Sequence, residues 1–415
     1  MLLTAAKPAS VVRTPSCFRF ATKYTYQYQH ACTTALPRHF SIQTPGKYDA
    51  VIIGAGPGGL TSAGNLLDQG LSRIAMIDEK FTAGRINDRY REVPSNTKVT
   101  KFQKWATGTT AFKDVLSKAP KGNAYERMLA MDQDAGCPLG EAVDVALVLS
   151  DGLREDERVT SIKSYVNVLE KTGDAWALPE LDLQTTRVVL AVGSHPRPNP
   201  TEREYPHLTS IHLDTALSPT KLEKAVPKGS RVAVVGSSHS AILAIKNLYE
   251  LSGVDVVNFY RSALLYAVFK EDWILYDNTG LKGIAADWAR TVLASPKLPS
   301  NLHRINLKQD GRPEREIYDA GLKDCTHIVS AIGYDINPLP TIKVDGKVVQ
   351  PDFNPLTGRF FNAKGSKEVL PGLFGAGIAY PERVTDRAGN VESAVGWFKF
   401  QHYLGRVAPE WAQHP

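Results

Sequence analysis

The chain has 415 residues, which is enough for two or three domains with complete hydrophobic cores. Hydrophobic residues make up 43% and charged residues 22%, as in ordinary globular proteins, and no apolar run approaches the roughly 18 residues of a membrane-spanning helix. The net charge of +6 lies entirely in residues 1–48, so the remainder is neutral and gives no reason to expect nucleic-acid binding. The four cysteines form no C-x-x-C pair, which excludes a redox dithiol motif and a zinc ribbon, and we predict no metal site.

Residues 1–47 form a leader that precedes the first predicted strand. The leader is rich in Ala, Ser, Thr and Arg and contains no acidic residue, which is the composition of a mitochondrial transit peptide. Its sequence Arg38-His39-Phe40-Ser41 resembles a site cut by the mitochondrial processing peptidase before Ser41. We therefore expect a mitochondrial protein, or a cytoplasmic one if the leader is an inactive N-terminal arm. Whether the leader is cleaved stays open.

A strand–loop–helix–strand pattern begins directly after the leader. The short β-branched run at residues 50–53 predicts a buried parallel strand. Apolar residues at helical spacing follow at 60–67, and a second apolar run at 74–77 ends in two acids. This order predicts a Rossmann-like βαβ unit that binds a dinucleotide.

Three glycines, Gly54, Gly56 and Gly59, have the G-x-G-x-x-G spacing between that strand and that helix. The first permits a tight turn, the second lets the backbone approach a pyrophosphate, and the third lets the helix pack against the strand. The N-terminus of the helix offers free N–H groups to the phosphates. At the end of the second strand, Asp78 or Glu79 is suited to bind the hydroxyls of a ribose.

The next segment leads from this unit to a domain crossing. The loop that follows the second strand often runs over the ligand, so Arg85 is a candidate contact. Residues 101–155 are predicted to be mostly helical, and residues 159–169 with 176–178 to form a hairpin about the turn at 171–174. An apolar strand then ends in Ala191-x-Gly193, and prolines follow it.

A second βαβ unit has the same architecture and different chemistry. A buried strand at 232–235 is followed by the loop Gly236-Ser-Ser-His-Ser, a helix at 242–251 and a strand at 254–260 that ends in Arg261. Ser238 stands where a second glycine often stands, and Ser240 lies in the same loop. A guanidinium at Arg261 suits a 2′-phosphate and favours NADPH over NADH, unless it is a solvated charge at the end of the strand. His239 either touches the nicotinamide nucleotide or has a structural role.

The C-terminal third returns to strands. We expect strands from Ile317 onward, ending in Ala331-Ile-Gly333-Tyr334. A further strand ends in Leu373-Phe-Gly-Ala-Gly377, and a helix is expected from about Val391 to Leu404. A strand that ends in glycines and is followed by a helix again places N–H groups at a ligand.

Taken together, these motifs resemble the two-dinucleotide-binding-domain flavoproteins over residues 47–405. That superfamily includes the pyridine nucleotide-disulfide oxidoreductases and the class B flavin monooxygenases. The resemblance implies an α/β fold with two Rossmann-like three-layer nucleotide-binding domains, in which the NAD(P)H domain is inserted into the FAD domain. It implies an FAD domain at 48–200 and 335–415 and an NAD(P)H domain at 201–334.

The resemblance also assigns cofactor residues. In this family the C-terminal strand and helix close over the isoalloxazine, and the spacing from Gly54 favours Asp78 over Glu79. The residues implied for FAD are Gly54, Gly56, Gly59, Asp78, Glu79, Arg85 and Gly377, and those for NADPH are Gly236, Ser238, Ser240 and Arg261. The chain departs from the disulfide reductases because it lacks their cysteine pair, and because Gly377-Ile378 replaces their Gly-Asp.

The function expected from these features is an FAD-dependent, NAD(P)H-utilising oxidoreductase. We expect a monooxygenase that acts on a small molecule through an adduct of reduced flavin with O2. The alternatives are a reductase that passes electrons to a quinone or another small acceptor, and a nucleotide-binding protein without catalysis. The sequence identifies no catalytic acid or base and leaves a homo-oligomer open.

Overall fold

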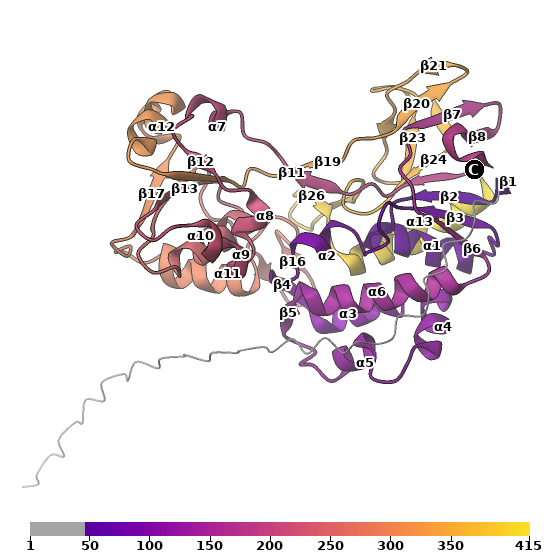
Figure 1. Ribbon diagram of the computed structural model, residues 1–415, viewed down its shortest axis with the longest axis horizontal. Helices are drawn as coiled ribbons and strands as arrows, with labels where there is room; N and C mark the ends of the chain where they lie inside the picture. The colour runs from indigo at the N-terminus through magenta and orange to yellow at the C-terminus, as the bar shows by residue number, and fades with distance from the viewer. Residues whose placement is uncertain (1–45) are drawn as a thin grey trace, which may run out of the picture. The chain divides into compact units, whose positions relative to one another are not determined.

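The computed structural model describes residues 46–415, which lie within one unit of the chain, His39–Pro415. A seven-stranded sheet with the order β22-β23-β24-β10-β2-β3-β6 contains the first predicted βαβ unit (Figure 1). Strand β2 lies between β10 and β3, and all three are parallel. The strands are β2 (Ala50–Ile53), β3 (Ile74–Ile77), β6 (Val159–Ile162), β10 (Val188–Leu190), β22 (Asp352–Phe353), β23 (Arg359–Phe361) and β24 (Val369–Gly375).

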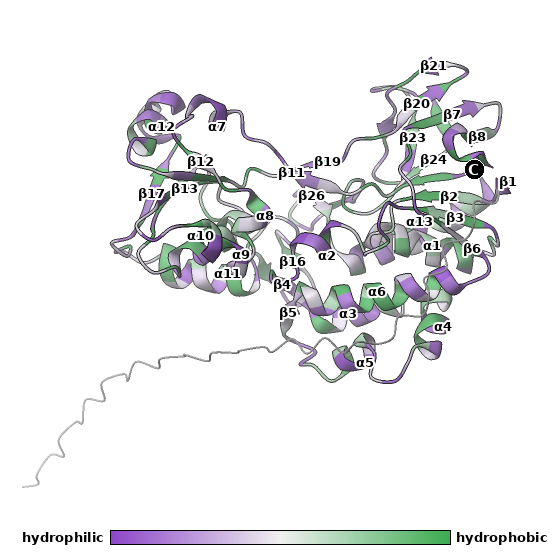
Figure 2. Cartoon of the chain, in the orientation of Figure 1, coloured by the Kyte–Doolittle hydropathy of each residue, from purple (hydrophilic) through white to green (hydrophobic). Residues whose placement is uncertain are grey.

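Helices cover one face of this sheet. Alternate residues of β2 and β3, such as Ile52 and Met76, pack against the helices. In this core Trp105 is fully buried and donates its indole N–H to the hydroxyl of Thr61. The central strands are hydrophobic, while the surface helices carry both hydrophobic and hydrophilic residues (Figure 2). The helices are α1 (Pro57–Asp68), α2 (Arg85–Arg89), α3 (Val99–Ala106), α4 (Thr110–Lys118), α5 (Ala124–Leu129), α6 (Leu139–Glu155) and α13 (Trp397–Gln413).

A six-stranded sheet covers the other face and completes three layers. Val51 and Ile53 point to this side and pack with Trp176 and Leu183 of the second sheet. The order is β1-β9-β8-β7-β20-β21. Its strands are β1 (Gly46–Tyr48), β7 (Val168–Thr172), β8 (Ala175–Leu178), β9 (Leu183–Thr185), β20 (Thr341–Val344) and β21 (Lys347–Val348).

The second βαβ unit lies in a separate parallel sheet with the order β12-β18-β13-β14-β17. Every strand of this sheet falls between Thr209 and Ser330, so the unit is inserted between β10 and β22 of the first sheet. The strands are β12 (Thr209–Ser210), β13 (Arg231–Val235), β14 (Asp255–Tyr260), β17 (Leu302–Asn306) and β18 (His327–Ser330).

Helices cover both faces of this second sheet. The cores on the two faces are separate: Val232 and Val256 contribute to one, and Ala233 and Val257 to the other. The helices are α7 (Thr201–Glu204), α8 (Leu213–Ala216), α9 (Pro219–Ala225), α10 (His239–Tyr249), α11 (Gly283–Trp288), which continues as a π-helix over Ala289–Leu293, and α12 (Glu314–Leu322). The predicted α/β fold with two Rossmann-like domains is therefore confirmed.

Short antiparallel pairs complete the structure. The chain enters and leaves the inserted unit through β11 (Ser194–Pro196) and β19 (Tyr334–Ile336), which pair with each other. The remaining pairs are β4 (Pro94–Lys98) with β5 (Gly136–Pro138), β15 (Val268–Phe269) with β16 (Ile274–Leu275), and β25 (Glu382–Thr385) with β26 (Val391–Ala394). No helix among residues 46–415 combines the length and the apolar character needed to cross a bilayer.

The helix predicted from Val391 is wrong at its start. Residues Val391–Ala394 form strand β26, and the helix begins at Trp397. Burial alternates along β26, with Glu392 and Ala394 inside, which is a strand pattern. The turn before it is closed by Asp386, whose carboxylate accepts hydrogen bonds from the backbone of Ala388 and Asn390.

Two other local predictions also differ from the structure. Residues 159–162 do not belong to the predicted hairpin, because β6 pairs in parallel with β3; the hairpin consists of β7 and β8 alone. Ile317 does not begin a strand but faces the core from α12, and the strand begins at His327. Short β-branched segments fit either structure, and tertiary pairing decides between them.

Candidate functional site

The two strand-to-helix turns have the same close backbone contact. At Gly54 the backbone φ is +107°, and a Cβ would lie 2.3 Å from the carbonyl oxygen of Ala191. At Gly236 φ is +134°, and a Cβ would lie 2.4 Å from the carbonyl oxygen of Ala331. Both alanines come from the Ala-x-Gly motifs of the neighbouring parallel strands. Only glycine fits either turn, so each loop leaves its strand at a fixed place at the carboxyl edge of its sheet.

The middle glycine of the first loop is not required by packing within the protein. A Cβ on Gly56 would find only ordinary contacts, at 3.8 Å from the carbonyl oxygen of Ala83 and 4.0 Å from Cα of Gly84. Gly56 is the N-cap of α1 and carries no side-chain cap, so the first N–H groups of the helix have no side-chain partner there. These features fit a pyrophosphate, because its oxygens can approach a backbone that carries no side chain and can accept hydrogen bonds from the free N–H groups.

The third glycine fixes α1 against the turn. A Cβ on Gly59 would lie 1.8 Å from the carbonyl oxygen of Gly54. In the first turn of α1, Gly58 approaches Gly377 so closely that a Cβ on Gly58 would lie 2.7 Å from Cα of Gly377. Gly377 has φ +76°, a conformation that favours glycine. The structure thus brings the first loop and the C-terminal glycine together, as a shared ligand would require.

Asp78 is engaged with the backbone around the loop. Its carboxylate accepts hydrogen bonds from the N–H of Ala55 at 2.9 Å, and from the N–H of Lys80 and Phe81 at 2.8 Å each. A carboxylate has about four acceptor positions, so about one remains for a ribose hydroxyl. Glu79 is exposed. The ribose role of either acid stays a prediction.

The loop after β3 folds back over Gly56. Phe81, Ala83 and Gly84 all have positive φ, at 53°, 59° and 72°. Such backbone is uncommon outside glycine, and its clustering marks a loop held in place by its surroundings. This loop ends at α2, which carries Arg85.

Arg85 points to the inserted unit. Its Nη2 donates to the carboxylate of Asp214, and its Nε donates to the hydroxyl of Tyr90 at 3.3 Å. Tyr90 donates to the second oxygen of Asp214 at 2.7 Å. The carboxylate of Asp214 is only 6% exposed, and burial, reinforced by Tyr334, raises the pKa of Tyr90 well above its usual range. Arg85 therefore fastens the two units, and its contact with FAD stays a prediction.

The second loop also leads into an uncapped helix. Ser238 is the N-cap of α10, is exposed, and makes no side-chain cap although serine is a good capping residue. Its backbone is extended, with φ −91°. Ser240 is the second residue of the helix and is half-buried. The first turn of α10 is therefore available to a phosphate, and the cofactor roles of Gly236, Ser238 and Ser240 stay predictions.

His239 is the first residue of α10. Its Nδ1 is buried and has no hydrogen-bond partner among residues 46–415. Burial, with a smaller contribution from the ammonium of Lys282, lowers the pKa of His239 to about 4. The imidazole is therefore neutral near pH 7, with one ring nitrogen left as an acceptor or donor for a ligand.

A hydrogen-bonded pair that the sequence did not single out, Asn258 and Arg304, supports this second loop. Asn258 of β14 is fully buried and donates to the carbonyl oxygens of Val234 at 3.1 Å and Gly236 at 2.8 Å. Arg304 donates to Asn258 at 3.1 Å and lies 4.2 Å from the ring centre of Tyr260. A polar residue between the apolar Val257 and Phe259 was the signal in the sequence.

Arg261 follows β14, as predicted, but it is not unpartnered. Its Nε and Nη2 donate to the two carboxylate oxygens of Glu314, at 2.8 and 2.7 Å. Glu314 is the first residue of α12, and the two side chains are 60% and 38% exposed. A 2′-phosphate at this place would have to compete with Glu314 for the guanidinium, and the phosphate role of Arg261 stays a prediction.

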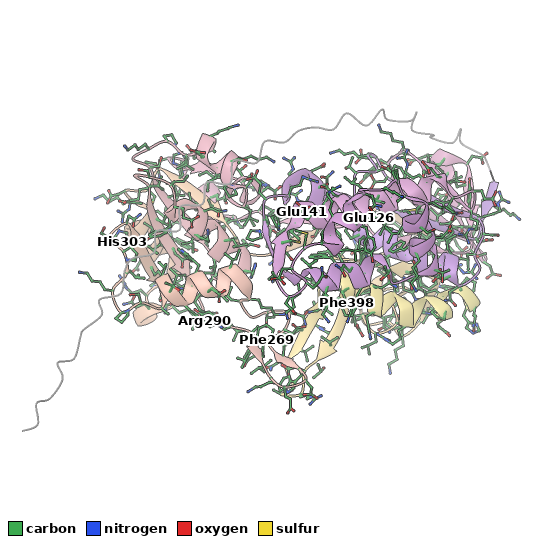
Figure 3. The ribbon with its side chains drawn as sticks, turned by 90° about the horizontal axis from the view of Figure 1, so that it is seen from below. Glu126, Glu141, Phe269, Arg290, His303 and Phe398 are labelled. Carbon is green, nitrogen blue, oxygen red and sulfur yellow. The ribbon has the colours of Figure 1, made fainter. Side chains whose placement is uncertain are left out.

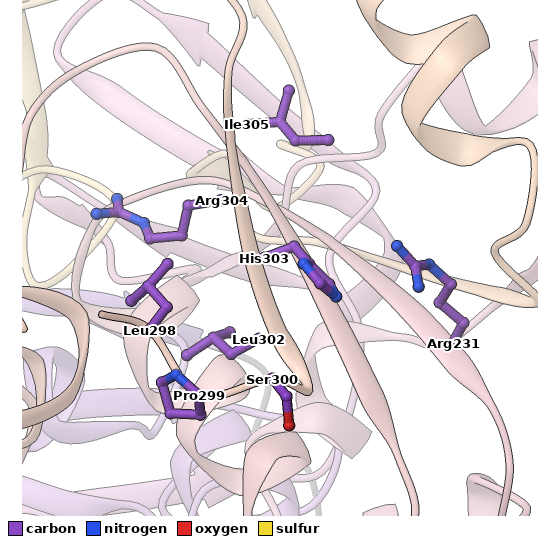
Figure 4. A pocket seen from close by; sticks show the side chains of 8 residues that line it. All are labelled: Arg231, Leu298, Pro299, Ser300, Leu302, His303, Arg304 and Ile305. Carbon is purple, nitrogen blue, oxygen red and sulfur yellow. The ribbon is translucent and has the colours of Figure 1, made fainter. Parts of the chain in front are cut away.

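A hollow of about 540 Å³ lies against the first residues of β13 and β17 in the same sheet (Figure 4). Arg231 and Leu302, the first residues of β13 and β17, line it together with His303 and Arg304. It is therefore at the amino end of the strands, whereas ligands of open parallel sheets bind at the carboxyl ends. We do not assign it to the nucleotide site.

The comparisons with known proteins agree with the geometry. Residues 48–349 match the family described as pyridine nucleotide-disulphide oxidoreductase. The chain is 41% identical over 398 residues to Monooxygenase AgnR1 of Paecilomyces divaricatus, which covers 89% of this chain and 99% of the relative.

Several solved structures share the fold. One is the ornithine N-hydroxylase of Kutzneria sp. 744, with a TM-score of 0.55, 13% identity, and coverage of 88% of this chain and 99% of that one. A second is a flavin-containing monooxygenase from Stenotrophomonas maltophilia, with a TM-score of 0.52, 15% identity, and coverage of 89% of this chain and 98% of that one. A third is a bacillithiol disulfide reductase from Staphylococcus aureus, with a TM-score of 0.51, 12% identity, and coverage of 88% of this chain and 98% of that one. The shared fold thus occurs in both oxygenases and disulfide reductases.

Replacing Gly56 with valine should remove bound flavin without unfolding the protein. The branched side chain would occupy the space that a pyrophosphate needs, while the nearest protein atom to its Cβ is 3.8 Å away. We expect flavin content to fall by at least about ten-fold, as measured by absorbance after denaturation. Gly405→Ala, at an exposed position of α13 with its nearest atom at 3.8 Å, is the control and should keep its flavin. A folded Gly56→Val protein with full flavin content would contradict the assignment.

Proposed function

We propose that this protein is an NADPH-dependent monooxygenase that acts on a small molecule. The chain belongs to the pyridine nucleotide-disulphide oxidoreductase family and is an oxidoreductase that uses FAD and NAD(P)H. The 41%-identical relative, which is named a monooxygenase, matches the chain nearly end to end. When bound, FAD supplies hydride acceptance and reaction with O2. The protein supplies the binding groups and the electrostatic environment.

The state of the cysteines is the observation that favours oxygen chemistry over disulfide reduction. Among residues 46–415 the cysteines are Cys137 and Cys325, both free and buried. Burial, with a contribution from Glu141, raises the pKa of Cys137 to about 11, and burial also raises the pKa of Cys325. Disulfide exchange needs a thiolate. Neither of these thiols is suited to it near pH 7.

The residues divide the binding work between the two loops. Gly56 and the first turn of α1 would hold the FAD pyrophosphate, and the first turn of α10 would hold that of NADPH. Helix α13 begins at Trp397, after Gly396, with no side-chain cap. This N-terminus would stabilise negative charge on a group placed against it. Neutral His239 offers a ring nitrogen to the nicotinamide nucleotide.

Isotope labelling would test the proposed reaction. The purified holoenzyme should consume NADPH under air and place one oxygen atom from ¹⁸O2 in a small-molecule product, when supplied with a panel of candidate metabolites. Mass spectrometry of the products and hydrogen peroxide measurement would follow the reaction. NADPH consumption that continues without O2 when a quinone is added, with no label in any product, would favour the reductase alternative.

Paired variants would test the preference for NADPH. Loss of Arg261 removes a charge-assisted hydrogen bond to the 2′-phosphate, so Arg261→Ala should raise KM for NADPH by about ten-fold and leave KM for NADH nearly unchanged. Glu314→Gln replaces the competing carboxylate with a weaker neutral acceptor, so it should lower KM for NADPH a few-fold.

Flavin reduction followed with both coenzymes would give these constants. Because both side chains are substantially exposed, the NADPH preference should also weaken with added salt. Equal effects of Arg261→Ala on NADPH and NADH would mean that the Arg261–Glu314 pair holds the fold of this edge and does not select the coenzyme.

We also propose that the leader directs the protein to mitochondria. The support is the acid-free, basic composition of residues 1–48 and the Arg38-His39-Phe40-Ser41 sequence, both of which lie largely outside the described residues. A fluorescent reporter fused after residues 1–48 should co-localise with a mitochondrial marker, and the imported reporter should begin near Ser41. A reporter that stays in the cytosol would refute the proposal.

A further inference from the structure

A small cavity lies where the inserted unit meets the C-terminal helix. Its volume is about 190 Å³. One wall comes from the segment between β16 and α11, and the other from the β25–β26 hairpin and the first two turns of α13. Figure 3 labels Phe398 at the start of α13 and Phe269 on the β15–β16 hairpin. The lining residues are Asp277, Asn278, Glu382, Val384, Ala394, Phe398, Lys399 and His402.

A buried carboxylate fixes the two walls to each other. Glu392 of β26 is 5% exposed. One of its oxygens accepts from the N–H of Asn278 at 3.0 Å and from the side-chain amide of Asn278 at 3.2 Å. The other accepts from the N–H of Thr279 at 3.1 Å and from the Thr279 hydroxyl. This arrangement satisfies the charge with four donors and sets the position of the residue just before them, Asp277.

Asp277 lies between two lysines. Lys282 donates to one of its carboxylate oxygens, and Lys399 donates to the other at 2.6 Å. Burial opposes ionisation of Asp277, but the hydrogen bonds from Lys282 and Lys399 outweigh it and lower the pKa of Asp277. Two ammonium groups thus share the Asp277 carboxylate at 13–29% exposure, and the negative charge of the buried Glu392 carboxylate also acts on Lys399.

The hydrogen bonds around the cavity leave one N–H of Lys399 unused. Both oxygens of Asp277 are engaged, and one oxygen of Glu382 accepts from Arg406, whose guanidinium balances the charge of that carboxylate. Lys399 Nζ donates to Asp277 and, at 2.5 Å, to the side-chain oxygen of Asn278. An ammonium has three N–H groups, so one remains for a ligand. The cavity therefore offers a charged donor to a ligand that brings an acceptor, best of all an anionic one.

The rest of the lining suits a ring. The ring of Phe398 lies 6.3 Å from that of His402, while Val384 and Ala394 supply aliphatic surface. A volume of about 190 Å³ is below the roughly 300–1,000 Å³ of pockets that enclose drug-sized ligands. The cavity can therefore take a one-ring compound, or one ring of a larger one.

We propose that this cavity binds the anionic group and ring of a small aromatic acid, with Lys399 pairing with the acid and Phe398 packing against the ring. Resting on the proposed monooxygenase function, this site would select the substrate by its acidic end. The inserted unit contributes through Asp277 and Asn278, which hold the ammonium in place, and the C-terminal helix contributes the ammonium and the ring.

Direct binding to the flavin-loaded protein would test the site without turnover. Isothermal titration with benzoate should give saturable binding of about one molecule per chain. Benzamide, which has the same ring and no charge, should bind about ten- to hundred-fold more weakly, the range expected for loss of a charge-assisted hydrogen bond. Equal affinities for benzoate and benzamide would overturn the proposal, as would no saturable benzoate binding up to about 10 mM, a very weak limit.

Three variants would show whether benzoate binds in this cavity. Lys399→Met should weaken benzoate binding to the level of benzamide. Lys101→Met removes the same charge from a residue whose Nζ lies 4.5 Å from the Phe398 ring centre but does not line the cavity, and it should retain benzoate affinity. Val384→Phe fills the cavity from a half-exposed position and should block benzoate without changing charge.

Flavin content and thermal unfolding would verify that each variant is folded. Unchanged benzoate binding in both Lys399→Met and Val384→Phe would overturn the proposal, and an equal loss in Lys101→Met would mean that long-range charge, not contact, controls binding. These results are independent of the proposed reaction: benzoate could bind as expected while no oxygen from ¹⁸O2 enters any product, in which case only the monooxygenase proposal fails.

Discussion

The close contact between a glycine turn and an alanine carbonyl, made twice, is the constraint on which both candidate nucleotide sites depend. Gly54 faces the carbonyl of Ala191 and Gly236 that of Ala331, and in each case a Cβ would come within 2.4 Å of the oxygen. Each turn therefore ends its strand at the same level as the neighbouring strand and starts its helix there. The two helices then present uncapped N-termini at the carboxyl edges of their sheets, which is where a phosphate is best stabilised.

The sequence was sufficient for these turns because their causes are local. Glycine at fixed spacing, a β-branched strand before it and an apolar helix after it specify the backbone with few alternatives. It failed at Val391, where a short segment has both strand and helix character and the choice depends on pairing with β25. Ile317 is a similar case, because its burial against the second sheet is what makes α12 a helix of the core.

Side-chain partners were not predictable in the same way, and they change the chemistry of the predicted residues. Arg85 pairs with Asp214 and Arg261 pairs with Glu314, partners that are 129 and 53 residues away along the chain. No periodicity records such pairs, because they form only after the units have folded. Arg261 was correctly placed after its strand, yet its guanidinium is already paired with a carboxylate on another helix. A 2′-phosphate at this place would have to compete with that carboxylate.

Carboxylates hold the backbone of several loops in this structure, and one of these loops forms a wall of the cavity beside α13. Asp78 holds the backbone of the first loop, and Glu392 holds the segment that carries Asp277. Because Glu392 already accepts four hydrogen bonds from N–H and O–H donors, the hydrogen bonds of Lys399 go to Asp277 and Asn278 instead. Lys399 is then left with an unused donor in a partly buried place, where charged hydrogen bonds are stronger than in water. The two walls lie more than a hundred residues apart in the sequence, so selectivity for an acidic ligand at this place would depend on the inserted unit staying docked on the C-terminal helix.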